Sequence, residues 1–293
     1  PPPPPPSRSA RMSSETFLPE DYSRSIELYD RVLTNYPESD VEDVALYSMG
    51  YCLTQMGNPT EGVSKYRTLL ERYPDSELAA ETCMRVGHYY FESFEYDSAY
   101  GYFSRILDYP DADPDVYQRS VYELGWTEYM RSNYLHSAAI FGYLIQDSQL
   151  MDSLDIPRRG GAMVDEAMEY LAHDFMEQKE GPSVPLATDF LDRFGDDEVS
   201  YTVLHHMARF YSEQGYWSDA ISAYEALLDR HPAHEQAPFF QAEIASAYEG
   251  LGDHEAATEA REELVENYGT DSEWAQAMGP ETARAAVDSL RGS

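Results

Sequence analysis

Two pairs of histidines have a residue type and spacing that could bind a metal ion. His205 and His206 are adjacent, and His231 and His234 are three residues apart. Adjacent residues on a helix point in different directions, and neither an HExxH pattern nor a pair of closely spaced cysteines accompanies these histidines. The sequence therefore predicts no zinc site.

A second candidate for chemistry is the run Asp111-Ala-Asp113-Pro-Asp115, which is similar to the opening of a calcium-binding loop. The Gly that must follow in such a loop is replaced by Val116, and the twelfth position holds Tyr122 rather than Glu. We predict that these carboxylates are solvated or cap a helix, and that the chain holds no metal.

Patterns of catalytic residues are also missing. The sequence contains no GxSxG, no GxxxxGK[ST] and no Rossmann glycine pattern. Paired carboxylates are uninformative in a chain with 54 acidic residues. We therefore expect neither an enzyme nor a cofactor-binding protein.

The charge is strongly negative, with 54 acidic against 20 basic residues and a net charge of −34. Lys65 and Lys179 are the two lysines. Phosphate binding needs clustered Lys and Arg, so we expect no nucleic-acid partner. The composition also fits a salt-tolerant protein, because salt screens self-repulsion. No run of 18 apolar residues exists, so we expect no direct membrane span.

The elements that position these side chains are encoded by a repeat. Its pattern begins with two apolar residues three positions apart, and Gly or Ala follows directly. A small residue lies twelve positions after this Gly or Ala, and an aromatic residue lies four positions after the small one. The copies include Leu46, Met49, Gly50, Gly62, Tyr66 and Pro74; Cys83, Val86, Gly87, Ala99, Phe103 and Pro110; Val121, Leu124, Gly125, Ser137 and Phe141; Leu204, Met207, Ala208, Ala220, Tyr224 and Pro232; and Gln241, Ile244, Ala245 and Ala257.

Each repeat predicts two amphipathic helices that form a hairpin. Its small residues allow close approach, the aromatics fill the space beside them, and the prolines end the second helix. Ser39 and Glu42 have capping-box spacing. Asn58 and Asp113 each precede a proline as a capping residue would. A hairpin cannot cover its own apolar face, so neighbouring hairpins must stack.

These motifs resemble the tetratricopeptide repeat (TPR) family over residues 22–270. The linkers at Tyr36-Pro37-Glu38-Ser39 and Tyr73-Pro74-Asp75-Ser76 are similar to those of bacterial cell-envelope members, such as the lipoprotein that helps assemble outer-membrane β-barrels and the periplasmic coordinator of the Tol–Pal system. The resemblance implies an all-α fold, a right-handed α-solenoid of antiparallel helix hairpins.

The pattern predicts five segments. They are a Pro-rich disordered linker at 1–16, a first block at 17–147 with a half unit and three units, a loop at 148–161, a second block of three units at 162–271, and a C-terminal capping helix and tail at 272–293. The chain begins with Pro rather than Met, so we expect it to be a fragment or a processed product.

The TPR resemblance implies a binding surface, because the first helix of each unit lines a concave groove in this family. In the first block, the side chains at these positions are mostly aromatic, and acidic residues including Glu81, Glu123 and Glu128 surround them. The predicted groove residues are Tyr47, Tyr51, Met84, His88, Phe91, Tyr122, Trp126 and Tyr129. The alternative is that these rings pack against the next unit.

We therefore expect a non-catalytic interaction scaffold that binds a protein or peptide with apolar anchors and positive charge. The resemblance favours a bacterial periplasm or cell envelope, with the cytoplasm as the alternative. Competing functions are a regulatory or substrate-recruiting domain of a larger polypeptide, and a structural spacer. Pairing of solenoid ends would give a homo-oligomer. Cys52 and Cys83 are expected to be buried thiols, with a single disulfide as the alternative.

Overall fold

The computed structural model describes residues 21–153, 161–178 and 181–279, and residues 281, 283, 284 and 286 beyond them. These parts contain helices and no strand. The chain divides into two compact units, Pro1–Ile140 with Met151–Gly161, and Phe141–Leu150 with Ala162–Ser293. Each is built from antiparallel helix hairpins, which confirms the predicted α-solenoid class.

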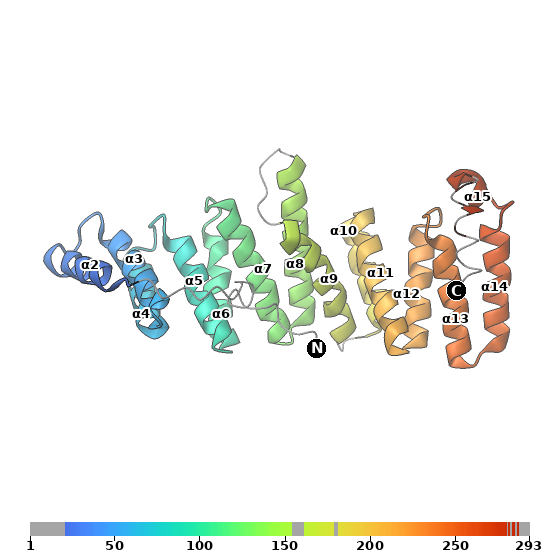
Figure 1. The fold of residues 1–293 in the computed structure, drawn as a ribbon, viewed down its shortest axis with the longest axis horizontal. Helices are drawn as coiled ribbons and strands as arrows, with labels where there is room; N and C mark the ends of the chain where they lie inside the picture. Colours follow the sequence, from blue (N-terminus) through green and yellow to red (C-terminus); the bar gives the residue numbers. More distant parts are fainter. Residues whose placement is uncertain are drawn as a thin grey trace. The chain divides into compact units, whose positions relative to one another are not determined.

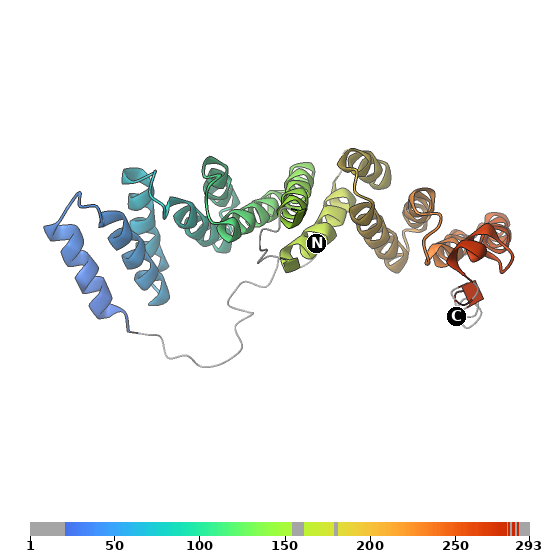
Figure 2. The same ribbon diagram turned by 90° about the horizontal axis from the view of Figure 1, so that it is seen from above.

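In the first unit, consecutive helices pack side by side (Figures 1 and 2). Helix α2 lies on α3, α3 pairs with α4, and α5 pairs with α6. A 3₁₀ turn, η1, continues α6 and contacts α7. The elements are α2 (Ser23–Asn35), α3 (Glu42–Gln55), α4 (Pro59–Arg72), α5 (Ala79–Glu92), α6 (Tyr96–Phe103), η1 (Ser104–Asp108), α7 (Pro114–Met130) and the first part of α8 (Tyr134–Ser153).

In the second unit, α11, α12, α13 and α14 each pack against the next helix in sequence. Short α15 contacts α14 and covers an apolar end, where Trp274 packs with Tyr268 in one buried cluster. The helices are α9 (Gly161–Glu177), α10 (Ser183–Phe194), α11 (Asp197–Gln214), α12 (Trp217–Arg230), α13 (Ala237–Leu251), α14 (His254–Tyr268) and α15 (Glu273–Met278).

Close contacts between small and aromatic residues hold the hairpins together, as the repeat predicts. A Cβ atom on Gly50 would lie 2.7 Å from the Tyr66 ring, and one on Gly87 would lie 2.6 Å from the Phe103 ring. In the α7–α8 hairpin, the small residue is Ser137, whose Oγ donates to the Gly125 carbonyl oxygen over 3.0 Å. Positions 50 and 87 therefore require Gly because a Cβ atom would collide with the neighbouring ring, not because the backbone turns there.

Of the three helix caps predicted from the sequence, the structure confirms one and differs at two. The Asp113 side chain accepts from the Asp115 N–H at 2.9 Å, so the predicted cap of α7 is confirmed. The Asn58 side chain makes no capping hydrogen bond at α4. The Ser39–Glu42 capping box is also wrong, because α3 begins at Glu42, whose buried carboxylate accepts from Arg72, Tyr73 and the Glu38 N–H.

Two predicted segment boundaries differ from those in the structure. The loop assigned to 148–161 is helical over 148–153, because α8 continues to Ser153, and Gly161 already begins α9. The C-terminal helix expected from residue 272 is interrupted at Gly279, whose φ is +88°, and the described residues 281, 283, 284 and 286 are helical again. The 1–16 linker and residues 154–160 lie outside the described residues.

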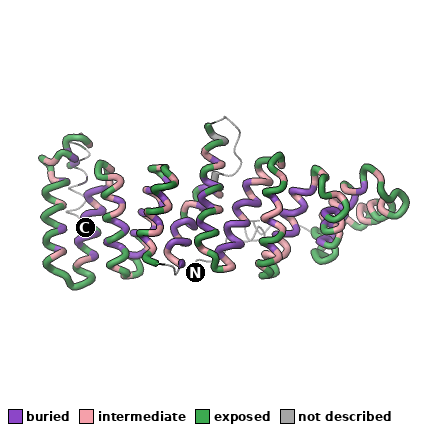
Figure 3. The backbone as a smooth tube through the Cα atoms, turned by 180° about the vertical axis from the view of Figure 1, so that it is seen from behind, coloured by how far each residue is buried: buried purple, intermediate pink, exposed green. Residues whose placement is uncertain are grey.

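Buried residues lie along the helix faces that meet a neighbouring helix (Figure 3). Cys52 and Cys83 belong to this interior as free thiols, which confirms the prediction of two small core residues. Among the helices described, none has both the length and the apolar character needed to cross a membrane.

Candidate functional site

Four of the eight predicted groove residues are exposed too little to bind a partner. Met84, Tyr122, Trp126 and Tyr129 are buried, and Trp126 is 0% exposed. The prediction that all eight side chains form one exposed face is therefore wrong for this half. The alternative weighed from the sequence, packing of these side chains within the solenoid, describes them better.

Local packing explains this burial. Met84 belongs to a core cluster with Ala99, Phe103 and Leu124 between neighbouring hairpins. The Trp126 ring lies edge-on to Tyr129, with 5.7 Å between centroids. Replacing a fully buried Trp by Ala costs about 3–5 kcal/mol of folding free energy, so Trp126→Ala would report on folding rather than on binding.

Tyr47 and Tyr51 remain partly exposed, but a cation from the same unit already engages them. The Arg85 guanidinium lies 5.4 Å from the Tyr47 ring centroid and 5.3 Å from that of Tyr51. Arg85 also donates to the Tyr47 hydroxyl at 2.8 Å and to Glu81 at 2.6 Å. Burial, with Glu81 nearby, raises the pKa of Tyr47, so the phenol stays protonated. Arg85 thus contacts the tyrosine rings that a cationic side chain of the partner was expected to contact.

His88 and Phe91 are the remaining predicted residues, and both are half-buried. The His88 ring lies edge-on to Phe103 at 5.4 Å, and its Nε2 atom is 3.7 Å from a carboxylate oxygen of Glu123. Of the predicted acidic rim, Glu128 is buried and ion-paired with Arg131. The binding role of the four accessible residues stays a prediction.

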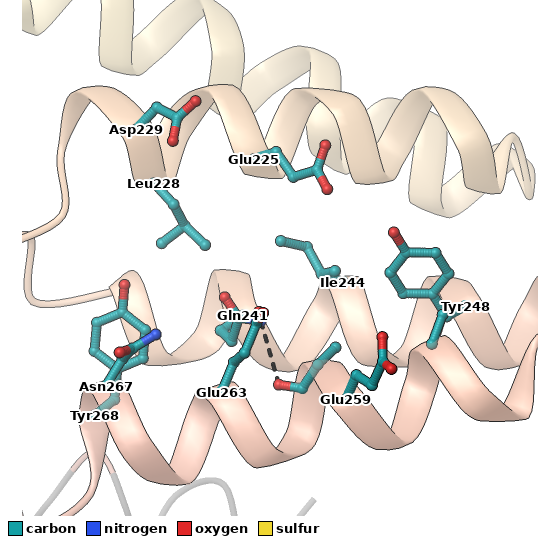
Figure 4. Close-up of a pocket in the computed structure, with 12 residues that line it drawn as sticks. Glu225, Leu228, Asp229, Gln241, Ile244, Tyr248, Glu259, Glu263, Asn267 and Tyr268 are labelled. Carbon is teal, nitrogen blue, oxygen red and sulfur yellow. Dashed lines mark hydrogen bonds between the residues drawn. The ribbon is translucent and has the colours of Figure 1, made fainter.

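A concavity lies in the second unit, between α12 and α14 and above α13 (Figure 4). It has a volume of about 390 Å³. Ile244 and Tyr248 of α13 supply apolar surface at its floor, Leu228 of α12 adds to it from one side, and carboxylates from both flanking helices line the sides. The carboxylates are Glu225 and Asp229 from α12 and Glu259 and Glu263 from α14. This set of four carboxylates over an apolar floor is called the acidic groove below.

The charges of the acidic groove are not balanced within the described residues, where none of its four carboxylates forms an ion pair with Lys or Arg. Burial, followed by the charges of Asp229 and Glu263, raises the pKa of Glu225. Burial and nearby acids including Glu225 raise the pKa of Tyr248 as well. The local field therefore opposes further negative charge and favours a cation.

One side chain on the floor is held firmly. Gln241 is buried, and its Nε2 donates to the Ala260 carbonyl oxygen at 3.2 Å and to a carboxylate oxygen of Glu263 at 3.0 Å. This pair of bonds orients one acid of the rim toward the floor. The groove is thus partly preorganised, which lowers the cost of ordering it around a ligand.

Sequence reasoning missed the acidic groove because it considered the first helices of the repeats, whereas the groove lies between two second helices. The candidate signal in the sequence is the spacing of its carboxylates. Glu225 and Asp229 are four residues apart, as are Glu259 and Glu263. Like charges at this spacing lie on one helix face, but the same spacing recurs at Glu262 and Glu266, so it does not single out the groove in so acidic a chain.

The histidines gather in the second unit but do not build a larger cluster of ligands. Nε2 of His173 lies 3.4 Å from Nε2 of His206, while the His205 ring faces Phe240 at 5.4 Å. The adjacent histidines thus point different ways, as expected. In the parts of the chain that the structure describes, no group of three or more His, Cys, Asp or Glu is placed to hold a metal ion.

The hairpins and their small–aromatic contacts define a helical-repeat protein. Residues 44–76, which include most of α3 and all of α4, match the tetratricopeptide repeat family, and so do residues 203–236, which include most of α11 and all of α12. Tetratricopeptide repeats are therefore identified in both units of the chain, in agreement with the predicted family. Proteins of this kind generally act as non-catalytic scaffolds for protein–protein interaction, and that is the class of function the repeats support here.

Solved structures with related folds are distant in sequence. The C-terminal part of a TPR repeat-containing protein from Cytophaga hutchinsonii is 14% identical, with a TM-score of 0.39, over 75% of this chain and 94% of that chain. BtubC from P. vanneervenii is 12% identical, with a TM-score of 0.40, over 91% of this chain and 89% of that chain. These likenesses do not bear on function. No curated protein matches the sequence.

Proposed function

We propose that this protein is a non-catalytic scaffold that holds a basic segment of a partner protein in the acidic groove. The observation that carries the proposal is the arrangement of four carboxylates without ion pairs among the described residues around an apolar floor. A partner's Lys or Arg would relieve the repulsion between Glu225 and Asp229, and between Glu259 and Glu263. The net charge of −34 would attract such a partner over a longer range.

The partner segment combines positive charge with an apolar side chain. Ile244 and Leu228 offer contact to methylene or methyl groups, while the rim carboxylates accept from ammonium or guanidinium groups. An anionic segment would meet four like charges. The proposed ligand is therefore an extended peptide with two or more Lys or Arg residues flanking an apolar anchor.

The test uses a random dodecapeptide library selected on the full chain, followed by fluorescence anisotropy with individual peptides. The variant Glu225→Gln/Glu263→Gln removes two charges from the groove. We expect its Kd for the selected peptides to be about tenfold weaker at low salt, since each partly exposed pair contributes roughly 0.2–1 kcal/mol. The difference should shrink as salt rises.

The matched control is Glu262→Gln/Glu266→Gln. These residues also lie on α14, are exposed, and are outside the groove lining, so the net charge changes equally. If the two double variants weaken binding equally, total charge rather than the groove decides recognition. Selected peptides without Lys or Arg would contradict the proposal directly.

We further propose that the scaffold serves in a bacterial cell envelope. Support comes from the Tyr-Pro-Glu-Ser and Tyr-Pro-Asp-Ser linkers at residues 36–39 and 73–76, which resemble those of envelope members of the family. Fractionation of source cells tests this placement, and recovery in the cytoplasmic fraction would contradict it.

A further inference from the structure

Five turns between paired helices share one backbone geometry. In each, a residue one or two positions past the last helical residue has positive φ, and its N–H and the next N–H bond back to carbonyl oxygens near the end of the helix. This is the Schellman arrangement, in which the left-handed position is usually Gly. The residues at this position are Gly57, Phe94, Ser132, Gly215 and Gly252.

Of these five residues, Ser132 and Phe94 are not Gly, and Phe94 carries the large apolar side chain. Its φ is +61°, a conformation that costs a residue with a Cβ atom about 1–2 kcal/mol. Its N–H bonds to the Phe91 carbonyl oxygen at 3.0 Å, and the next N–H, from Glu95, bonds to the Tyr90 carbonyl oxygen at 2.9 Å. Gly57 makes the same turn without a side chain.

Burial does not repay this cost, because Phe94 is 76% exposed, the highest value among the exposed large apolar residues described. The ring is nevertheless held in place. It lies edge-on to Tyr96 at 6.3 Å, and Tyr96 in turn lies edge-on to Phe91 at 5.4 Å. A preorganised aromatic side chain loses little conformational entropy when a partner covers it.

The surroundings of the ring restrict what can cover it. Glu92, Glu95 and Asp97 are exposed nearby in the chain, and Phe94, Glu95, Asp97 and Arg131 line one hollow of about 580 Å³. Arg131 is already paired with Asp97 at 2.9 Å. Carboxylates repel an anionic membrane surface, and a second copy would bring the same acidic turn and a net charge of −34.

We propose that Phe94 is a binding anchor that inserts into an apolar pocket of a folded partner protein whose pocket rim carries Lys or Arg. Stability does not select an aromatic at this turn, since Gly would be favoured there, so the ring is explained by the contact it makes outside the chain. The negative charges of Glu95 and Asp97 are complementary to the basic rim of the partner's pocket. This surface belongs to the first unit and is independent of the acidic groove.

The test places the photoreactive analogue p-benzoylphenylalanine at position 94 of the full chain in source cells. The adduct is identified by mass spectrometry, the partner is purified, and its Kd is measured for wild type and three variants. We expect Phe94→Gly to weaken binding at least tenfold while raising the folding equilibrium constant by about tenfold, which separates lost binding from misfolding. Ser132→Gly is the matched control: it relieves the same φ of +61° and should leave the Kd unchanged.

Several outcomes would overturn the proposal. They are the absence of any adduct, an adduct with a second copy or with lipid, and a purified partner that binds wild type and Phe94→Gly equally. Support requires the tenfold loss with Phe94→Gly and further weakening with Glu95→Gln/Asp97→Asn that fades at high salt. Because none of these variants alters the acidic groove, failure of one proposal leaves the other standing.

Discussion

Replacing Glu42 by Gln tests how the α3–α4 hairpin is locked. Glu42 is 2% exposed at the first turn of α3, and its carboxylate accepts from both terminal nitrogens of Arg72 at the end of α4. The Tyr73 hydroxyl donates to it at 2.7 Å, and the Glu38 N–H donates as well. One buried acid thus joins the start of the hairpin to its end.

The magnitude follows from these contacts. Gln keeps one acceptor oxygen but turns its amide nitrogen toward groups that donate. Losing one hydrogen bond to a charged group costs roughly 1.5–3 kcal/mol. Breaking a fully buried ion pair costs about 3–5 kcal/mol, but Arg72 is 41% exposed and can regain water. We therefore expect Glu42→Gln to lower the opening free energy of this hairpin by about 2–3 kcal/mol.

The effect should depend on pH. Burial opposes ionisation of Glu42, but the hydrogen bonds from Tyr73, the Glu38 backbone and Arg72 outweigh it, so its pKa lies below 4.5. The contribution is then complete above the unfolded pKa and is lost as pH falls through the lower folded pKa. The difference between wild type and Glu42→Gln should shrink in acid.

Hydrogen exchange of amides in α3 and α4, measured in the full chain, reads the opening free energy locally, which suits a repeat protein that need not unfold in one step. Glu71→Gln, at an exposed position beside Arg72, is the control and should change it by less than about 0.5 kcal/mol. Equal exchange in Glu42→Gln and wild type at neutral pH would refute the reasoning, as would a difference that persists unchanged in acid.

Three further predictions concern the interior. Gly87→Ala should cost about 1–3 kcal/mol because its Cβ would lie 2.6 Å from the Phe103 ring, whereas Gly101→Ala, with nothing within 4 Å, should stabilise α6 by about 0.5–1 kcal/mol; urea denaturation distinguishes them. Burial and a neighbouring histidine lower the pKa of His173 to about 4, so protonation favours the unfolded chain as pH falls from 6.5 toward 4. Hydrogen exchange in α9 should show a loss of about 1 kcal/mol at pH 5.5, absent in His173→Gln. Burial raises the pKa of the Cys83 thiol to about 11, so labelling by a thiol reagent at pH 8 should be slow in the native protein and fast in urea; fast native labelling would contradict the buried position.

Much of the fold could be predicted from the sequence, because the repeat fixes local contacts. Gly50 and Tyr66 lie sixteen residues apart, as do Gly87 and Phe103, and two antiparallel helices with a short turn bring each pair together. Proline and a capping Asp113 mark helix ends by backbone chemistry that needs no distant partner. The extension of α8 to Ser153 was missed because the turn-forming Pro157 and Gly160-Gly161 led the whole segment 148–161 to be assigned to a loop.

The sequence by itself determined the class of protein, its helices and its strongly acidic surface, since these depend on composition and on spacing along one chain. Only the tertiary structure decided which side chains a partner can reach. Trp126 was expected to be accessible from its helical position, but it is buried. Arg85 contacts the tyrosines that were expected to bind a ligand. The acidic groove is formed by α12 and α14, which are separated in sequence by α13. Exposure is set by what neighbouring elements cover, and a repeat pattern does not specify that.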